Sequence, residues 1–183
     1  KLDGLVFTHS HKDHIAGMDD IRAFNYLQGK AIDVYASAET QVIIRNEFPY
    51  VFSEIDYPGI PKVSMHTIDK YRTFSIGDIH FTPIEVYHYK MPVLGFRFNG
   101  FTYITDANFI ADDEVEKVMG SNFLVLNALR REKHISHFTL SEAIEMANRI
   151  GAPQTFLTHI SHQLGLHEDV EQELPPGIHL AYD

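Results

Sequence analysis

The stretch Thr8-His9-Ser10-His11-Lys12-Asp13-His14 places three imidazoles and one carboxylate within six residues. It follows the apolar run Leu5-Val6-Phe7, which predicts a buried strand, and it precedes Ile15-Ala16-Gly17-Met18, which is typical of a helix start. Histidine nitrogen suits zinc, and carboxylate oxygen suits zinc or a harder ion such as manganese. Seven residues cannot wrap all of these ligands around one ion. The spacing therefore indicates two adjacent divalent ions.

Length and composition limit the classes of protein that the chain can belong to. Its 183 residues predict a single domain over residues 1–183, and an apolar share of 44% is ordinary for a globular protein. No run of 18 apolar residues occurs, so we expect no membrane partner. No signal peptide is visible, although the chain begins with Lys1 and not with Met.

The charge and the absence of cysteine narrow the partners and ligands. A formal net charge of −10 disfavours nucleic acid as a partner, but bound cations can still attract a small anionic substrate. Without cysteine there are no thiolate ligands, so any metal must be held by the 12 histidines and by carboxylates. The same absence fits a reducing compartment, and we expect a cytoplasmic protein.

Hydrophobic periodicity and turn signals predict a mixed α/β chain with an antiparallel centre. Two signals are specific: Asn99-Gly100 predicts a hairpin turn, and Thr139 three residues before Glu142 predicts a capping box. Residues 49–62 predict an aromatic loop, either a lid beside a pocket or a loop packed on the core. The expected helices span 15–28, 38–47, 112–119, 140–150 and 167–173. The expected strands span 2–7, 33–36, 63–68, 71–75, 79–86, 94–98, 101–105, 123–126, 154–158 and 178–181.

Three later residues fit the first motif. His88, Asp106 and His159 each come just after an apolar strand, where a side chain is held rigidly. One histidine after a strand is more often a hydrogen-bonded structural residue than a ligand. The joint pattern favours a metal site.

Together these residues resemble the ordered ligand set of the metallo-β-lactamase fold hydrolases, in which the motif H-x-H-x-D-H is followed by a His, an Asp and a last His. The resemblance implies an αββα sandwich, with one ion on His9, His11 and His88. It implies a second ion on Asp13, His14 and His159, bridged to the first by Asp106. Members usually carry several strands before the motif, and only the eight residues 1–8 precede it here, so we expect the first N-terminal strands to be absent.

A narrower resemblance is to the PhnP group of phosphoribosyl 1,2-cyclic phosphate phosphodiesterases. It rests on residues 127–143, with His134-Ile135-Ser136-His137, and on residues 157–163, 174–177 and 181–183. In that group a histidine before the corresponding helix faces the metals. Some relatives hold a structural zinc on cysteines, which this chain lacks.

The chemistry that this implies is hydrolysis of a phosphodiester. Two divalent ions, zinc or manganese, would lower the pKa of water and neutralise charge on the phosphoryl oxygens. His137 is the first candidate for the general acid and His134 the second. Asp13 is expected to be both a metal ligand and a catalytic residue. Arg130, Arg131 and Lys133 form a basic cluster that either binds the phosphate or is a solvated loop.

We therefore expect a binuclear metal-dependent phosphodiesterase whose partner is a small molecule, such as phosphoribosyl 1,2-cyclic phosphate. The alternatives are a lactonase, a thioesterase, a β-lactamase or a tRNA 3′-processing nuclease of the same fold, or a non-catalytic metal-binding module. Many relatives are dimers, so a homodimer is a further expectation from the resemblance.

Overall fold

The computed structural model describes residues 1–54 and 57–182. The chain forms two compact units, Lys1–Asp78 and Ile79–Asp183, and each is described by itself. In the described residues, no helix has both the length and the apolar character needed to cross a membrane.

The first unit is built on a parallel sheet in the order β1-β2-β3. In β2, buried and half-buried residues alternate, as expected for a strand with one face on the core. The buried core includes Phe7, Ile15, Val34 and Ile44. The strands are β1 (Leu5–Val6), β2 (Ile32–Ala36), β3 (Val63–Thr67) and β4 (Phe74–Ile76). The helices are α1 (Lys12–Ile15), α2 (Arg22–Gln28) and α3 (Ala38–Glu47), with 3₁₀ turns η1 (Ala16–Ile21) and η2 (Pro49–Phe52).

The helix expected over residues 15–28 starts earlier and is interrupted. It begins at Lys12, inside the histidine-rich motif, and passes through η1 before α2 ends at Gly29, whose φ of 64° closes the helix in the left-handed region. The loop expected over 49–62 begins with η2, and Val51 and Phe52 pack against the core. This favours the core-packed alternative for residues 49–52. Residues 55–56 of that prediction lie outside the described residues.

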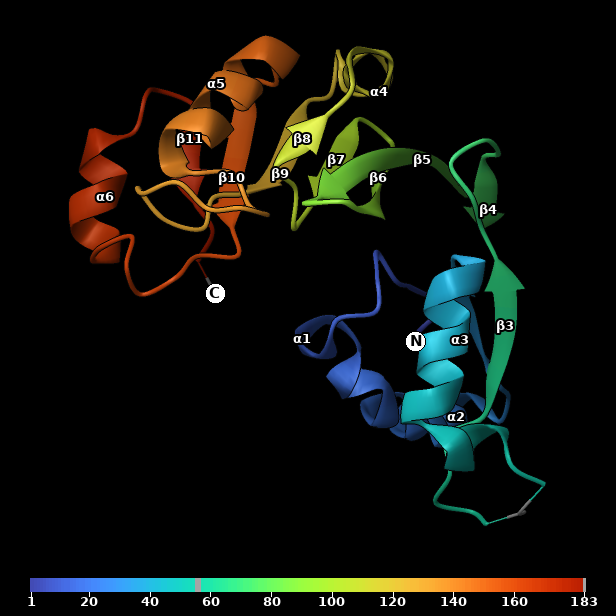
Figure 1. Cartoon of the computed structure of the whole chain (residues 1–183). Helices are drawn as coiled ribbons and strands as arrows, with labels where there is room; N and C mark the ends of the chain where they lie inside the picture. The colour runs from blue at the N-terminus through green and yellow to red at the C-terminus, as the bar shows by residue number, and fades with distance from the viewer. Residues whose placement is uncertain (55–56, 183) are drawn as a thin grey trace. The chain divides into compact units, whose positions relative to one another are not determined.

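The second unit contains a mixed sheet in which β11-β10-β9-β7-β6-β5 are neighbours and β8 pairs with β5. Its strands are β5 (Ile79–His88), β6 (Met91–Phe98), β7 (Phe101–Ile104), β8 (Phe109–Ile110), β9 (Phe123–Asn127), β10 (Gln154–Thr158) and β11 (Ile178–Leu180). Its helices are α4 (Asp112–Val118), α5 (Leu140–Ile150) and α6 (His167–Glu173). Helix α4 packs against β5, α5 against β9, and α6 against β11 (Figure 1).

Local sequence explains the two best-predicted elements of this unit. The side chain of Thr139 accepts from the amide of Glu142, whose carboxylate accepts from the amide of Thr139, so α5 begins with the expected capping box. Asn99 and Gly100 have φ angles of 47° and 79°, as a tight hairpin turn between β6 and β7 requires. The short strand β8 was not expected from the sequence.

Strand direction gathers several chain segments at one edge of this sheet. Strands β7, β9 and β10 are parallel. Strand β5 runs in the same direction as β7, because each is antiparallel to β6. The carboxyl ends of all four strands therefore meet at one edge, where the segments after β5, β7, β9 and β10 begin.

Candidate metal centre

The histidine-rich motif of the first unit lies at the carboxyl end of β1. His9 is buried, with 2% of its surface exposed, and its ring centroid lies 4.7 Å from that of His11 and 4.2 Å from that of His14. Because α1 starts at Lys12, Asp13 and His14 stand on its first turn, and His14 Nε2 is 3.4 Å from Asp13 Oδ2. The motif residues thus form one cluster of nitrogen and oxygen donors, the ligand loop (residues 8–14).

In the second unit, four of the expected site residues lie together at the edge where the carboxyl ends of the strands meet. They are His88, Asp106, His137 and His159. His88 is the last residue of β5 and not, as expected, a residue beyond the strand. Asp106 and His159 follow β7 and β10, and His137 lies in the segment between β9 and α5. The ligand atoms of His88, Asp106 and His137 all lie within 4.8 Å of one another.

Asp106 is the centre of this second cluster. Its side chain is 2% exposed, and its Oδ1 accepts a hydrogen bond from Thr105 Oγ1 at 2.6 Å. Oδ1 lies 3.3 Å from His159 Nε2, and Oδ2 lies 3.4 Å from His137 Nε2. A buried carboxylate is stable only when charge or hydrogen bonds compensate for its desolvation.

These separations fit donors that share an ion. Two atoms that each lie about 2.1 Å from a tetrahedral ion are about 3.4 Å apart. The Asp106–His159, Asp106–His137 and Asp13–His14 pairs are at 3.3, 3.4 and 3.4 Å, whereas an ordinary N–H···O bond is about 2.7–3.2 Å. Nitrogen and carboxylate donors without thiolate are the set that zinc and manganese accept.

The backbone at these positions is unusual. Asp106 and His159 have φ angles of 56° and 55°, and Tyr89, next to His88, has 59°. Side chains other than glycine rarely adopt this conformation, and it clusters at functional sites. Tyr89 and His159 come directly after β5 and β10, and Asp106 comes two residues after the last residue of β7. The chain therefore turns abruptly where the donors His88, Asp106 and His159 lie.

Residues that the sequence did not single out hold the donors in place. His88 Nδ1 donates to the carbonyl of Ser136 at 2.9 Å, which leaves Nε2 as the ring's lone-pair nitrogen. Asn127, fully buried at the end of β9, accepts from the amide of Ala107 at 2.8 Å and donates to its carbonyl at 2.9 Å. An asparagine that ends a buried strand is the only sequence signal that could have indicated this role.

His134 and His137, the two candidates for the general acid, are in direct contact. Their Nδ1 atoms are 3.1 Å apart, so one ring donates to the other, and Ser136 Oγ lies 3.0 Å from His137 Nδ1. Burial, followed by the neighbouring His137 and Arg130, lowers the pKa of His134 below its usual 6.5. His137 is 8% exposed and has its Nε2 beside Asp106. His134 contacts His137 on the opposite side of the ring, at Nδ1.

The basic cluster is tied to the protein. Arg130 donates to Gln163 Oε1 at 2.8 Å, Arg131 pairs with Glu173 at 2.8 Å, and Lys133 pairs with Glu142. Each predicted phosphate contact therefore already has a protein partner, and a role in substrate binding stays a prediction.

The geometry and the donor set define a class: a mixed α/β protein with histidine and aspartate groups able to hold divalent metal. Residues 1–160 match the sequence profile of the family described as beta-lactamase superfamily domain, and the chain belongs to that family. The fold class and the family expected from the sequence are thus confirmed.

Two relatives and one solved structure show the range of this similarity. The whole chain is 34% identical to an octanoyltransferase of Porphyromonas gingivalis, of which it covers 37%. Half of the chain (49%) is 28% identical to ribonuclease Z of Methanococcus maripaludis, of which it covers 32%. A diphosphatase from the PhnP family is 35% identical, with a TM-score of 0.89 over 99% of this chain and 69% of that one. The chain thus spans about a third of the curated relatives that it matches.

Proposed function

We propose that the chain carries a binuclear metal centre and hydrolyses a phosphorus–oxygen bond in a small molecule, with a cyclic phosphodiester as the first substrate class. The observation that carries the proposal is the Asp106 cluster, in which three histidines surround one buried carboxylate at the edge of the sheet. The proposal is supported by the chain's membership of the family described as beta-lactamase superfamily domain and by its similarity to a PhnP-family diphosphatase.

The proposed ligand sets are those that the resemblance implies. His9, His11 and His88 would hold one ion, and Asp13, His14 and His159 a second, with Asp106 shared. Bound divalent ions would supply Lewis acidity and a water of lowered pKa. Zinc and manganese both suit these donors.

The chain's own groups would orient the donors and move a proton. The Ser136 carbonyl fixes the tautomer of His88, and Thr105 fixes the carboxylate of Asp106. His137, buried beside Asp106, would give its Nε2 proton to the leaving alkoxide, and His134 and Ser136 would hold its ring from the other side.

A second candidate reaction is hydrolysis of a diphosphate bond. The diphosphatase from the PhnP family favours it, because it is 35% identical and matches nearly the whole chain. The same donors serve both reactions, since each requires charge neutralisation on phosphoryl oxygens and an activated water.

A substrate panel tests the proposal. The zinc- or manganese-loaded protein is assayed on a cyclic ribose phosphate, a nucleoside diphosphate, bis(p-nitrophenyl) phosphate, a tRNA 3′ precursor and an acyl thioester. We expect turnover of the first or second substrate, loss of that turnover in Asp106→Asn, and retention in the exposed control Asp113→Asn. Turnover of only the tRNA or only the thioester would refute the proposed substrate class and favour the corresponding alternative.

A further inference from the structure

A second pocket lies in the first unit, away from the ligand loop. It has a volume of about 470 Å³, in the range of small-molecule sites. Its lining comes from helix α2, from the turn into β2 and from the segment before β3. The lining residues are Arg22, Asn25, Tyr26, Gly29, Lys30, Ala31, Pro58, Ile60 and Lys62.

The topology separates this pocket from the candidate metal ligands of the same unit. The ligand loop follows the carboxyl end of β1, whereas residues 29–31 and Lys62 precede the amino ends of the parallel strands β2 and β3. The five residues of β2 span about 16 Å at roughly 3.3 Å each. The pocket is therefore at the opposite edge of the sheet from the ligand loop.

Side-chain hydrogen bonds join the residues that line the pocket. Asn25 donates to the carbonyls of Lys30 at 3.0 Å and Lys62 at 2.8 Å, and it accepts from the amide of Lys62 at 3.0 Å. Tyr26 donates its hydroxyl to the carbonyl of Pro58 at 2.9 Å. Arg22, Asn25 and Tyr26 follow the spacing i, i+3, i+4, which places them on one face of α2, and Gly29 comes directly after the helix. The lining is thus joined into one framework.

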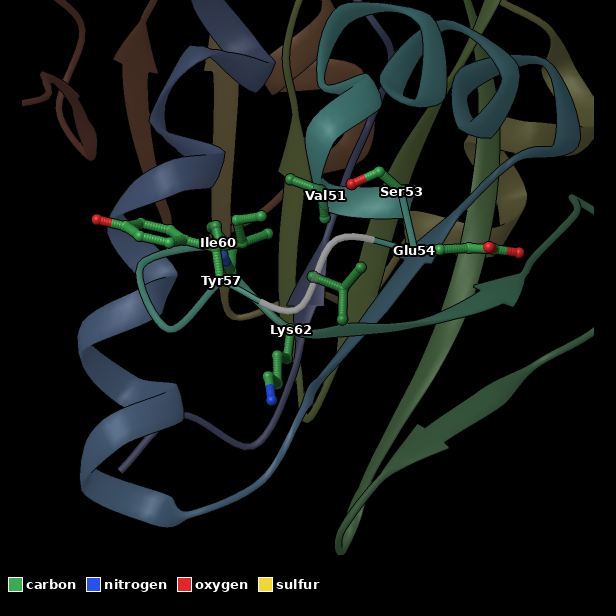
Figure 2. Close-up of a pocket in the computed structure, with 8 residues that line it drawn as sticks. Val51, Ser53, Glu54, Tyr57, Ile60 and Lys62 are labelled. Carbon is green, nitrogen blue, oxygen red and sulfur yellow. The ribbon is translucent and has the colours of Figure 1, made fainter.

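The charge of the lining is opposite to that of the chain. The sequence has 25 acidic and 15 basic residues, yet the described lining holds Arg22, Lys30 and Lys62 and no Asp or Glu. Within residues 1–54 and 57–182, no ion pair joins Arg22 or Lys30 to a carboxylate. Glu54, which lines the neighbouring 320 Å³ pocket, points away from Lys62 (Figure 2). The charges of Arg22 and Lys30 are therefore available to a ligand.

One aromatic ring completes the site. Tyr26 is 68% exposed although its hydroxyl is anchored on Pro58, so it offers a fixed ring face. Pro58 and Ile60 add apolar surface beside it. An anchored ring next to an Arg and two Lys residues suits a ligand that combines a planar ring with an anionic group.

We propose that this pocket binds a small phosphorylated molecule with a planar heterocycle, of the nucleoside monophosphate class, at a site separate from the ligand loop of the same unit. Arg22 and Lys30 contact the phosphate, and the Tyr26 ring stacks on the heterocycle. Lys62 adds positive potential at the amino end of β3.

The test is a titration of the ¹⁵N-labelled 21.0 kDa chain, followed by amide shifts in NMR spectra. The probes are adenosine 5′-monophosphate, adenosine and inorganic phosphate, each added separately. We expect the monophosphate to shift the amides of residues 29–31 saturably, and each partial probe to bind at least tenfold more weakly. The double variant Arg22→Ala/Lys30→Ala should lose tenfold or more in affinity. Arg72→Ala, a basic residue of the same unit outside the lining, should not.

The amides next to Asp106 and His159 report on the other site in the same spectra. Shifts confined to them, or equal affinity in the double variant and the wild type, would overturn the proposal, as would the absence of saturation up to about 10 mM monophosphate. Inorganic phosphate that binds as tightly as the monophosphate would overturn the part assigned to Tyr26. Hydrolytic turnover of the double variant should equal that of the wild type, so failure of this proposal is distinguishable from failure of the proposed function.

Discussion

The contact of His137 with Asp106 leaves two roles for this histidine, and one substitution separates them. As a general acid it protonates the leaving oxygen, and as a metal ligand it holds an ion together with His88 and Asp106. His137→Gln keeps an amide donor in a space that is 8% exposed, but glutamine cannot transfer a proton. The substitution therefore removes the acid with little change of volume.

The expected loss depends on the leaving group. General acid catalysis contributes about 10²–10⁴-fold, which corresponds to about 3–5 kcal/mol of activation free energy. We expect a fall in kcat of this size on a cyclic ribose phosphate, whose leaving alkoxide needs a proton. Bis(p-nitrophenyl) phosphate should be hydrolysed at nearly the wild-type rate, because nitrophenolate leaves as an anion.

The assay compares both substrates and the metal content for the wild type, His137→Gln and the control His162→Gln, which changes an exposed histidine. Equal losses on both substrates would refute the general-acid role. Loss of one ion per chain in His137→Gln would show instead that His137 is a ligand.

Three further predictions concern the framework of the second unit. Thr139→Ala should lower the free energy of unfolding by about 1–2 kcal/mol in a urea titration, because it removes the capping box of α5. Thr139→Ser should keep the capping box and the wild-type stability. Equal stability of all three proteins would contradict this. Asn127→Ala should lower the free energy of unfolding by about 1–3 kcal/mol, because it leaves the buried Ala107 amide without an acceptor and loosens the backbone beside Asp106. Unchanged stability and metal content would show that Asn127 does not position that segment. For Glu171, burial tends to raise the pKa, but hydrogen bonds from the Leu180 amide and His179 outweigh it and hold the pKa below its usual 4.5. This stabilisation is therefore present above pH 4.5 and is lost as the pH falls through the lowered pKa, so the Tm difference between wild type and Glu171→Gln should shrink in acid, and a constant difference would refute the assignment.

Local signals made much of the fold predictable from the sequence. Helix α5 has the predicted bounds because its start depends on Thr139 and Glu142, which are three residues apart, and its end on Gly151. The hairpin at Asn99-Gly100 is equally local. By contrast, β8 is only two residues long and exists because it pairs with β5, and the start of α1 inside the ligand loop was hidden by its polar residues.

The residues of the candidate site could be predicted from the sequence, but the contacts that hold them in place could not. The order of His88, Asp106 and His159 after apolar strands is visible along the chain, since each ends or follows a strand. The support from Ser136 to His88 joins residues 48 positions apart, and no local pattern encodes it. The pairing of Arg131 with Glu173, 42 positions away, is likewise a tertiary contact. A basic cluster in the sequence therefore could not reveal that its charges already have partners.

The proposed function requires that this chain holds two divalent ions and hydrolyses a phosphorus–oxygen bond with them. The decisive experiment is elemental analysis of the purified protein, coupled to an assay of bis(p-nitrophenyl) phosphate hydrolysis by the same preparation. We expect two ions per chain, hydrolysis, and loss of both on treatment with a chelator. A preparation that binds no metal after incubation with zinc or manganese, or that binds two ions and hydrolyses no phosphodiester or diphosphate, would contradict it.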